Sequence, residues 1–193
     1  MGRTRSEESQ DNLAYKINND MIKIHRPDTK DAPSWYPYFF DLAAGDDLIT
    51  ALENNKQQMQ QLIHSIPASA ADYRYAPDKW SVKQVFIHVA DDERYYAYKS
   101  FCYARQIAVH LEVPAGEGYT KDFNAANRTL ADIAAELLTI RDATISLFSS
   151  MTDAMLDFRG FPGGDIYTAR SLGWMAVGHS IHHYNMLREK YGV

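Results

Sequence analysis

Apolar residues recur every three or four positions in four stretches of the chain, which is the spacing of one face of an α-helix. The first stretch starts near Asp46 and stops at Pro67, because proline cannot continue a helix. Its apolar side chains form one stripe: Leu48, Leu52, Met59, Leu62, Ile63 and Ile66. The pattern therefore predicts a helix over residues 46–66.

A second helix is predicted to begin after Ser81. Ser81 and Gln84 have the capping-box spacing, in which each side chain bonds the backbone N–H of the other residue. The apolar spacing continues to about Val109. The segment that follows, residues 111–128, contains one proline and two glycines and is longer than a connection between antiparallel neighbours requires. It is typical of a crossover in a helix bundle.

Two further helices complete the pattern. Thr129 with Asp132 predicts the start of a third helix that ends near Met151. Thr168 is a cap for a fourth helix that ends near Gly192. No run of alternating β-branched residues indicates a strand. The predicted fold is all-α, a four-helix bundle with a long crossover between the second and third helices.

The N-terminal part has a different pattern and is predicted to be a lead-in over residues 1–45, ahead of a bundle domain over residues 46–193. Residues 1 to about 12 are polar and charged and are expected to be frayed. Aromatic residues then cluster from Trp35 to Phe40, and three nearby prolines exclude a long helix. Because so much aromatic surface is costly in water, we expect it to cover its own bundle or that of a partner.

Composition and charge narrow the class of protein. The net charge of −5 comes from interspersed signs without a basic patch, which argues against a nucleic-acid partner. The single cysteine, Cys102, excludes an internal disulfide and a cysteine-rich zinc site. No apolar run approaches the roughly 18 residues of a membrane span, and the charged start lacks a signal-peptide core. We therefore expect a cytoplasmic protein that does not enter a membrane.

Three histidines carry the candidate chemistry. His179 and His183 are four residues apart on the fourth helix, which places their side chains one turn, roughly 6 Å, apart along its axis. They share a helix face with Leu172 and Met175, so they are expected to point into the bundle. His88 lies within the apolar stripe of the second helix and would approach from another direction.

Three neutral imidazoles without a fourth protein ligand leave one position open, which is typical of a catalytic metal site. Zinc, nickel, iron and copper all accept imidazole ligands. His182 also has a spacing that shares a face with His179, so it competes with His183 for the third place, and we favour His183. The alternative is that the histidines are core residues satisfied by hydrogen bonds, and for His88 taken alone this is the better interpretation.

Two carboxylates follow His88 at helical spacing. Asp91 and Asp92 lie three and four residues later, so either side chain is placed to accept the remaining ring proton of His88 and orient it. The alternative is a solvated acidic turn together with Glu93 and Arg94. The sequence does not separate these two interpretations.

These residues together resemble a known family. The segments 74–81 (Arg-Tyr-Ala-Pro-Asp-Lys-Trp-Ser), His88, 91–94 (Asp-Asp-Glu-Arg) and 178–183 (Gly-His-Ser-Ile-His-His) follow one another in the order and spacing of the DinB-like family of metal-binding four-helix bundles. The resemblance extends from about Trp35 to Tyr191, which is nearly the whole chain.

The resemblance implies a bundle with a long crossover, a homodimer, and a divalent metal held by His88, His179 and His183. Zinc and nickel are the favoured ions, with iron as a third candidate. Characterised relatives include thiol-dependent S-transferases and isomerases that use bacillithiol, mycothiol or glutathione. The leading hypothesis is therefore a metal-dependent thiol S-transferase that joins a low-molecular-weight thiol to a small electrophile.

Three alternatives stand beside this hypothesis. Water in the open position would make the protein a metal-dependent hydrolase. A non-enzymatic module would use the metal or the bundle pocket to hold a small ligand, in a role related to stress. A purely structural protein would use the three histidines as hydrogen-bonded core residues. No Ser-His-Asp order, phosphate-binding glycine loop or paired-carboxylate motif supports a further mechanism.

Overall fold

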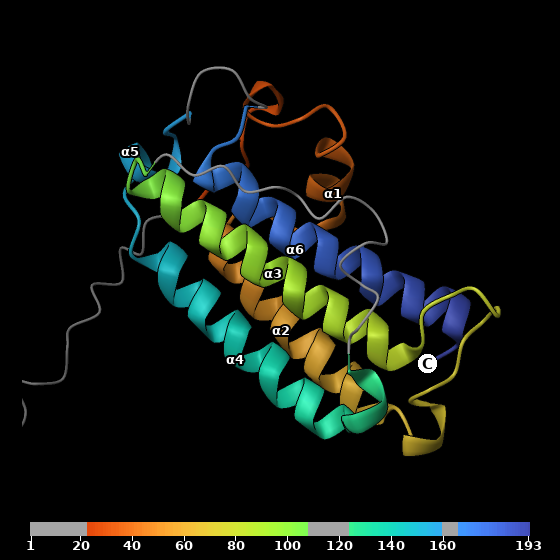
Figure 1. The fold of residues 1–193 in the computed structure, drawn as a ribbon. Coiled ribbons are helices and arrows are strands. Elements are labelled where there is room, and N and C mark those ends of the chain that lie inside the picture. Colours follow the sequence, from red (N-terminus) through yellow and green to blue (C-terminus); the bar gives the residue numbers. More distant parts are fainter. Residues whose placement is uncertain (1–22, 108–123, 160–165) are drawn as a thin grey trace, which may run out of the picture.

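Four long helices form the body of the protein in the computed structural model, which describes residues 23–107, 124–159 and 166–193 (Figure 1). They are α2 (Leu48–Ser65), α3 (Val82–Ala104), α4 (Leu130–Ser149) and α6 (Ala169–Met186). The short elements are η2 (Thr29–Asp31), α1 (Pro37–Leu42), η3 (Ala68–Ala70), η5 (Ala125–Asn127), α5 (Asp153–Leu156) and the π-helical turn η6 (Leu187–Tyr191). The described residues contain no strand, which agrees with the predicted all-helical fold.

The long helices pack as a four-helix bundle in which α2 and α3 each lie between α4 and α6. α3 and α4 run in the same direction, since both start at the end of the bundle where the C-terminus lies (Figure 1). The end of α3 and the start of α4 therefore lie at opposite ends of the bundle, which is the arrangement of the predicted crossover. Among the described helices, none combines the length and the apolar character that crossing a membrane would need.

The predicted helix starts are confirmed by their caps. The side chains of Ser81, Thr129 and Thr168 each accept a hydrogen bond from the backbone N–H three residues later, and all three caps are complete capping boxes. The first long helix also ends where predicted, because Ile66, the residue before Pro67, has an extended backbone. Local sequence thus fixes where the site-bearing helices α3 and α6 begin.

α3 ends at Ala104, before the predicted end near Val109. Gln106 adopts a left-handed backbone with φ of 54°. The Ile107 N–H then bonds the Cys102 carbonyl at 2.8 Å. Backbone bonds of this kind around a left-handed residue close a helix C-terminus. The prediction was wrong in this last turn, although Val109 itself lies outside the described residues.

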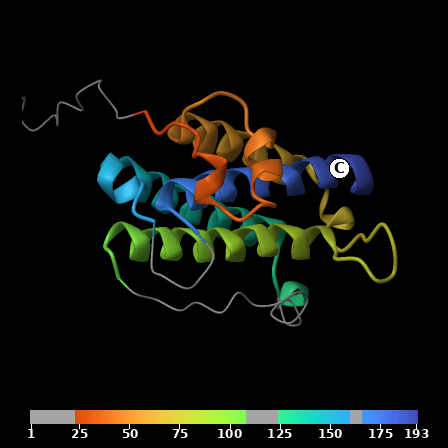
Figure 2. The same ribbon diagram turned by 90° about the horizontal axis from the view of Figure 1, so that it is seen from above.

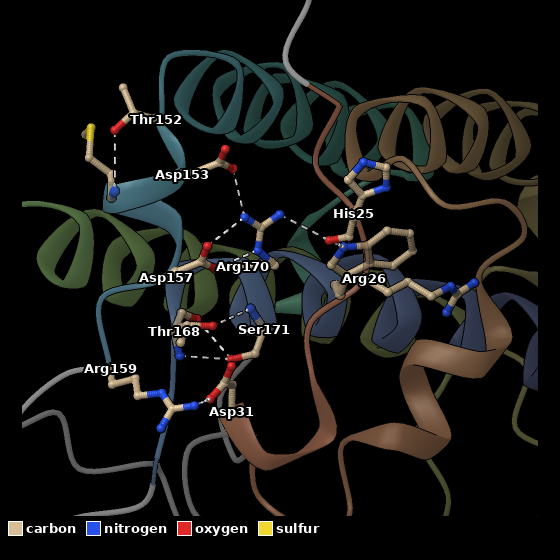
Figure 3. Close-up of polar contacts among 12 residues, drawn as sticks. His25, Arg26, Asp31, Thr152, Asp153, Asp157, Arg159, Thr168, Arg170 and Ser171 are labelled. Atoms are coloured by element: carbon tan, nitrogen blue, oxygen red, sulfur yellow. Dashed lines mark hydrogen bonds and ion pairs between the residues drawn. The ribbon is translucent and has the colours of Figure 1, made fainter.

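The N-terminal segment is tied to the first turn of α6 by a set of polar contacts (Figure 3). Arg170 donates hydrogen bonds to both carboxylate oxygens of Asp157, at 2.7 and 2.9 Å, and to Asp153 at 3.0 Å. The backbone carbonyl of His25 accepts from Arg170 at 3.3 Å and from the Trp174 indole at 3.0 Å. The guanidinium of Arg170 therefore links both the lead-in and the α5 region to α6.

The aromatic lead-in packs on the bundle of its own chain. α1 begins at Pro37, where a proline removes no needed backbone N–H, and it packs against α6. Tyr36 and Phe40 are buried, whereas Tyr38 is 54% exposed. Part of the aromatic segment thus covers the bundle of its own chain, while Trp35 and Tyr38 stay exposed. The frayed segment predicted over residues 1–12 lies outside the described residues.

A buried ion pair joins three of the long helices. Arg141 of α4 donates to both carboxylate oxygens of Glu93 on α3, at 2.7 and 2.8 Å. It also donates to the Asn55 side chain at 2.9 Å and to the Leu52 carbonyl at 3.1 Å, both on α2. Only 1% of Glu93 is exposed, so the interpretation of this residue as part of a solvated acidic turn was wrong.

Candidate metal centre

The side chains of His88, His179 and His183 meet between α3 and α6, which lie side by side along the bundle (Figures 1 and 2). His88 is in the second turn of α3, at a position set by the capping box at Ser81. His179 and His183 are one turn apart in the second half of α6. All three histidines are buried.

The three rings converge through their Nε2 atoms. The Nε2 atom of His179 lies 3.2 Å from that of His88 and 3.1 Å from that of His183. One ring nitrogen from each histidine lies within 4.8 Å of one from each of the others. The geometry predicted from two distant parts of the sequence is therefore present.

His182, the competing residue, points to a different neighbour. It is half-buried, and its Nδ1 atom shares a hydrogen bond of 3.1 Å with the Tyr38 hydroxyl. It is not one of the residues whose nitrogens cluster. The structure thus brings His183 to His88 and His179 and leaves His182 beside them.

Burial keeps the clustered imidazoles neutral. It lowers the pKa of His88 from 6.5 to about 4, with a smaller contribution from His182, while the charge of Asp91 opposes the shift. Burial and the neighbouring histidines lower the pKa values of His179 and His183 well below the ordinary value. At neutral pH each ring therefore has a lone pair to offer to a metal ion.

A divalent ion fits this donor set better than hydrogen bonding does. An imidazole nitrogen carries either one proton or one lone pair, so His179 Nε2 makes at most one good hydrogen bond to its two close neighbours. His183 Nδ1 is also buried and has no hydrogen-bond partner among the described residues. Two nitrogen ligands of one tetrahedral zinc ion lie about 3.3 Å apart, since Zn–N bonds are about 2.0–2.1 Å long. The two distances from His179 Nε2, 3.2 and 3.1 Å, are close to that value.

Of the two aspartates that follow His88, Asp92 lies at the cluster. Its Oδ2 atom is 3.3 Å from His179 Nε2, and its Oδ1 atom is 3.7 Å from His88 Nδ1. Asp91 instead accepts a hydrogen bond from Arg94 at 2.9 Å. Asp91 thus acts on His88 only through its charge, whereas Asp92 lies near the ring nitrogens of the cluster.

Aromatic rings surround the cluster, and sequence reasoning did not assign them to the site. The ring centre of Trp80 lies 4.6 Å from that of His88. Phe39 and Tyr96 lie 6.1 and 6.0 Å from His179. Trp80 directly precedes Ser81, the N-cap of α3, so its place near His88 could have been predicted from the sequence. Nothing in the local sequence connects Phe39 to His179.

The lowered histidine pKa values predict how stability depends on pH. The unfolded chain takes up protons on these histidines below about pH 6.5, whereas the folded metal-free protein does so on His88 only near pH 4. The stabilisation is therefore complete above pH 6.5 and is lost as the pH falls toward 4, by on the order of 3 kcal/mol for His88.

Urea unfolding of the chelator-treated protein at several pH values between 7.5 and 4 would measure this loss. His88→Gln should have a shallower dependence on pH in the same range, because one titrating group is removed. Identical pH dependences for the two proteins would contradict the assignment of a buried neutral His88.

The fold and the histidine cluster define a class of protein, the helix bundles that build a metal site from inward side chains on facing helices. The family match makes this specific. The chain belongs to the DinB superfamily, whose family model matches residues 51–187. The resemblance inferred from the sequence motifs is thereby confirmed.

A solved structure has the same fold. YfiT from Bacillus subtilis, described as a probable metal-dependent hydrolase with an unusual four-helix bundle topology, aligns with a TM-score of 0.61. The alignment covers 87% of this chain and 94% of YfiT at 17% sequence identity. No curated protein gives a significant match to the chain.

Proposed function

We propose that the protein is a divalent-metal-dependent enzyme that activates a small nucleophile at His88, His179 and His183. The observation that carries this proposal is the convergence of three buried, neutral imidazoles on one point. Zinc and nickel are the favoured ions, and iron is the third candidate. A bound divalent ion would supply Lewis acidity that lowers the pKa of a coordinated thiol or water.

The protein's own residues would support this chemistry. The Asp92 carboxylate lies 3.3 Å from His179 Nε2, so it is within reach of a proton on a nucleophile held at the cluster. Trp80 and Phe39 cover the histidines with apolar rings and limit the access of water. Asp92 is thus the candidate general base, and the rings set the polarity around it.

The reaction we propose first is conjugation of a low-molecular-weight thiol, through its sulfur, to a small electrophile, which the family resemblance supports. Hydrolysis is the second candidate. It is favoured by the description of YfiT as a probable metal-dependent hydrolase and by the carboxylate of Asp92, because water needs a base to lose its proton. A small-molecule substrate, a homodimer and a cytoplasmic location stay predictions.

The experiment that separates these reactions starts from chelator-treated protein reloaded with Zn²⁺, Ni²⁺ or Fe²⁺. Conjugation of bacillithiol, mycothiol or glutathione to monobromobimane tests thiol transfer, and release of p-nitrophenol from p-nitrophenyl acetate tests hydrolysis. We expect metal-dependent turnover in one of the assays, a loss of at least about tenfold in Asp92→Asn, and little change in the matched variant Asp91→Asn.

Equal activities in the two aspartate variants would remove Asp92 from the chemistry. Saturable binding of a thiol without turnover in either assay would instead favour a non-enzymatic binding module.

A further inference from the structure

α1 lies outside the part of the chain that matches the family model, yet it reaches the histidine cluster. The match covers residues 51–187, whereas α1 spans Pro37–Leu42. α1 packs along α6, and both ribbon views show the two helices side by side (Figures 1 and 2). α1 therefore brings side chains from outside the matched region to the histidine cluster.

The contact between α1 and α6 is made at backbone distance and depends on Gly178. A Cβ atom at Gly178 would lie 2.2 Å from the carbonyl oxygen of Phe39 and 2.6 Å from its carbonyl carbon. Backbone atoms cannot yield as a flexible side chain can, so only glycine permits this approach. Because His179 is the next residue, the same contact fixes the distance between α1 and the cluster.

The approach places two aromatic side chains of α1 at the histidines. The ring of Phe39 lies 6.1 Å from His179 and 5.7 Å from His182. The ring of Tyr38 lies 5.9 Å from His182, and its hydroxyl bonds His182 Nδ1 at 3.1 Å.

The residues that cover this side of the cluster are partly exposed. Tyr38 is 54% exposed, and Phe39 and His182 are half-buried. A molecule that approaches His179 past α1 therefore meets the two α1 rings before it meets the cluster.

We propose that α1 is the substrate-selecting wall of the site, where Phe39 contacts a planar apolar group of the substrate. The proposal rests on the proposed function and narrows its substrate class to small molecules with an aromatic or similarly flat group near the reacting atom. An aromatic ring favours offset or edge contacts with another ring, and such a contact changes affinity by about 3- to 10-fold.

Two metal-binding probes that differ only in their apolar part test this wall. Benzohydroxamate and acetohydroxamate share one metal-binding group, but only the first carries a ring. Calorimetric titration into the zinc-loaded protein should show tighter binding of benzohydroxamate. In Phe39→Ala this preference should fall by about 3- to 10-fold, while acetohydroxamate affinity and zinc content stay within about twofold.

Three further variants distinguish an effect of the Phe39 ring from a folding defect. Phe39→Leu keeps an apolar side chain and removes the flat ring, so it should reduce the preference with little change in melting temperature. Gly178→Ala should reduce the preference by displacing α1 while every side chain of the wall remains. Phe101→Ala removes another exposed aromatic ring, on α3, and should leave the preference unchanged.

The outcomes separate the two proposals. If neither hydroxamate binds the zinc-treated wild-type protein, the proposed function is contradicted, and so is the proposed role of α1 in substrate selection. If both probes bind in a zinc-dependent manner and their affinity ratio is the same in wild type, Phe39→Ala and Phe39→Leu, only the wall is overturned.

Discussion

Replacing His179 with alanine is expected to lower zinc affinity by at least about 100-fold, since it removes one of the three proposed ligands. His179 should be the most sensitive position, because its Nε2 atom is the one close to both other rings, at 3.1 and 3.2 Å. Competition with a chromophoric chelator would measure the affinity. Metal analysis after dialysis would measure the stoichiometry.

The neighbouring histidines provide a matched comparison on the same turn. His183→Ala should also lose zinc affinity, although less than His179→Ala, whereas His182→Ala should stay within about threefold of wild type, because the His182 Nδ1 atom bonds Tyr38. The reverse order of the two effects would show that His182 is the ligand. Equal zinc content in the wild type and all three variants would mean that the histidines are core residues.

Glu93→Gln is expected to destabilise the fold by about 3–5 kcal/mol, which is the second large effect. The substitution keeps the size of the side chain but leaves the Arg141 guanidinium, only 2% exposed, without a counterion. The loss of stability is large because a buried charge without a counterion is stabilised neither by bulk water nor by an opposite charge. The free energy of unfolding in urea, measured near pH 7, gives the size of the effect.

A surface ion pair between α2 and α4 serves as the control. Asp142, next to Arg141, pairs with Lys56 at a position where Asp142 is 60% exposed, so Asp142→Asn should cost no more than about 1 kcal/mol. The double variant Glu93→Gln with Arg141→Met should recover much of the stability, since it removes the stranded charge. A Glu93→Gln effect as small as that of Asp142→Asn would contradict the account of a buried ion pair.

The helices and the histidine cluster were predictable because their signals are local or periodic. Ser81 and Gln84 are three residues apart, and the same is true of the other caps, so each helix start was visible in a few residues. Once the starts were fixed, the spacing of His179 and His183 determined a shared face on α6. Only the pairing of this face with His88 needed the bundle arrangement, and the resemblance supplied it.

The parts that were not predictable depend on contacts between distant segments. Glu93 and Arg94 are adjacent in sequence, yet Glu93 is buried against Arg141 of α4, whereas Arg94 is exposed and pairs with Asp91 and with Glu136 at the surface. One residue of helix rotation decides between these environments, and charge alone does not reveal it. The position of Phe39 beside His179 was not predictable for the same reason, because it depends on a contact with Gly178, far along the chain.

The attachment of the lead-in to α6 has a consequence for measuring the state of association. Ile24 is 1% exposed, and its backbone exchanges hydrogen bonds with the start of α2, donating to Asp47 and accepting from Leu48. A chain shortened to begin at residue 46 would uncover the surface of α6 around Trp174. Uncovered apolar surface promotes association. A dimer formed by such a fragment would therefore result from the truncation and would not show that the intact protein is a dimer. The folding unit starts well before the region of family similarity.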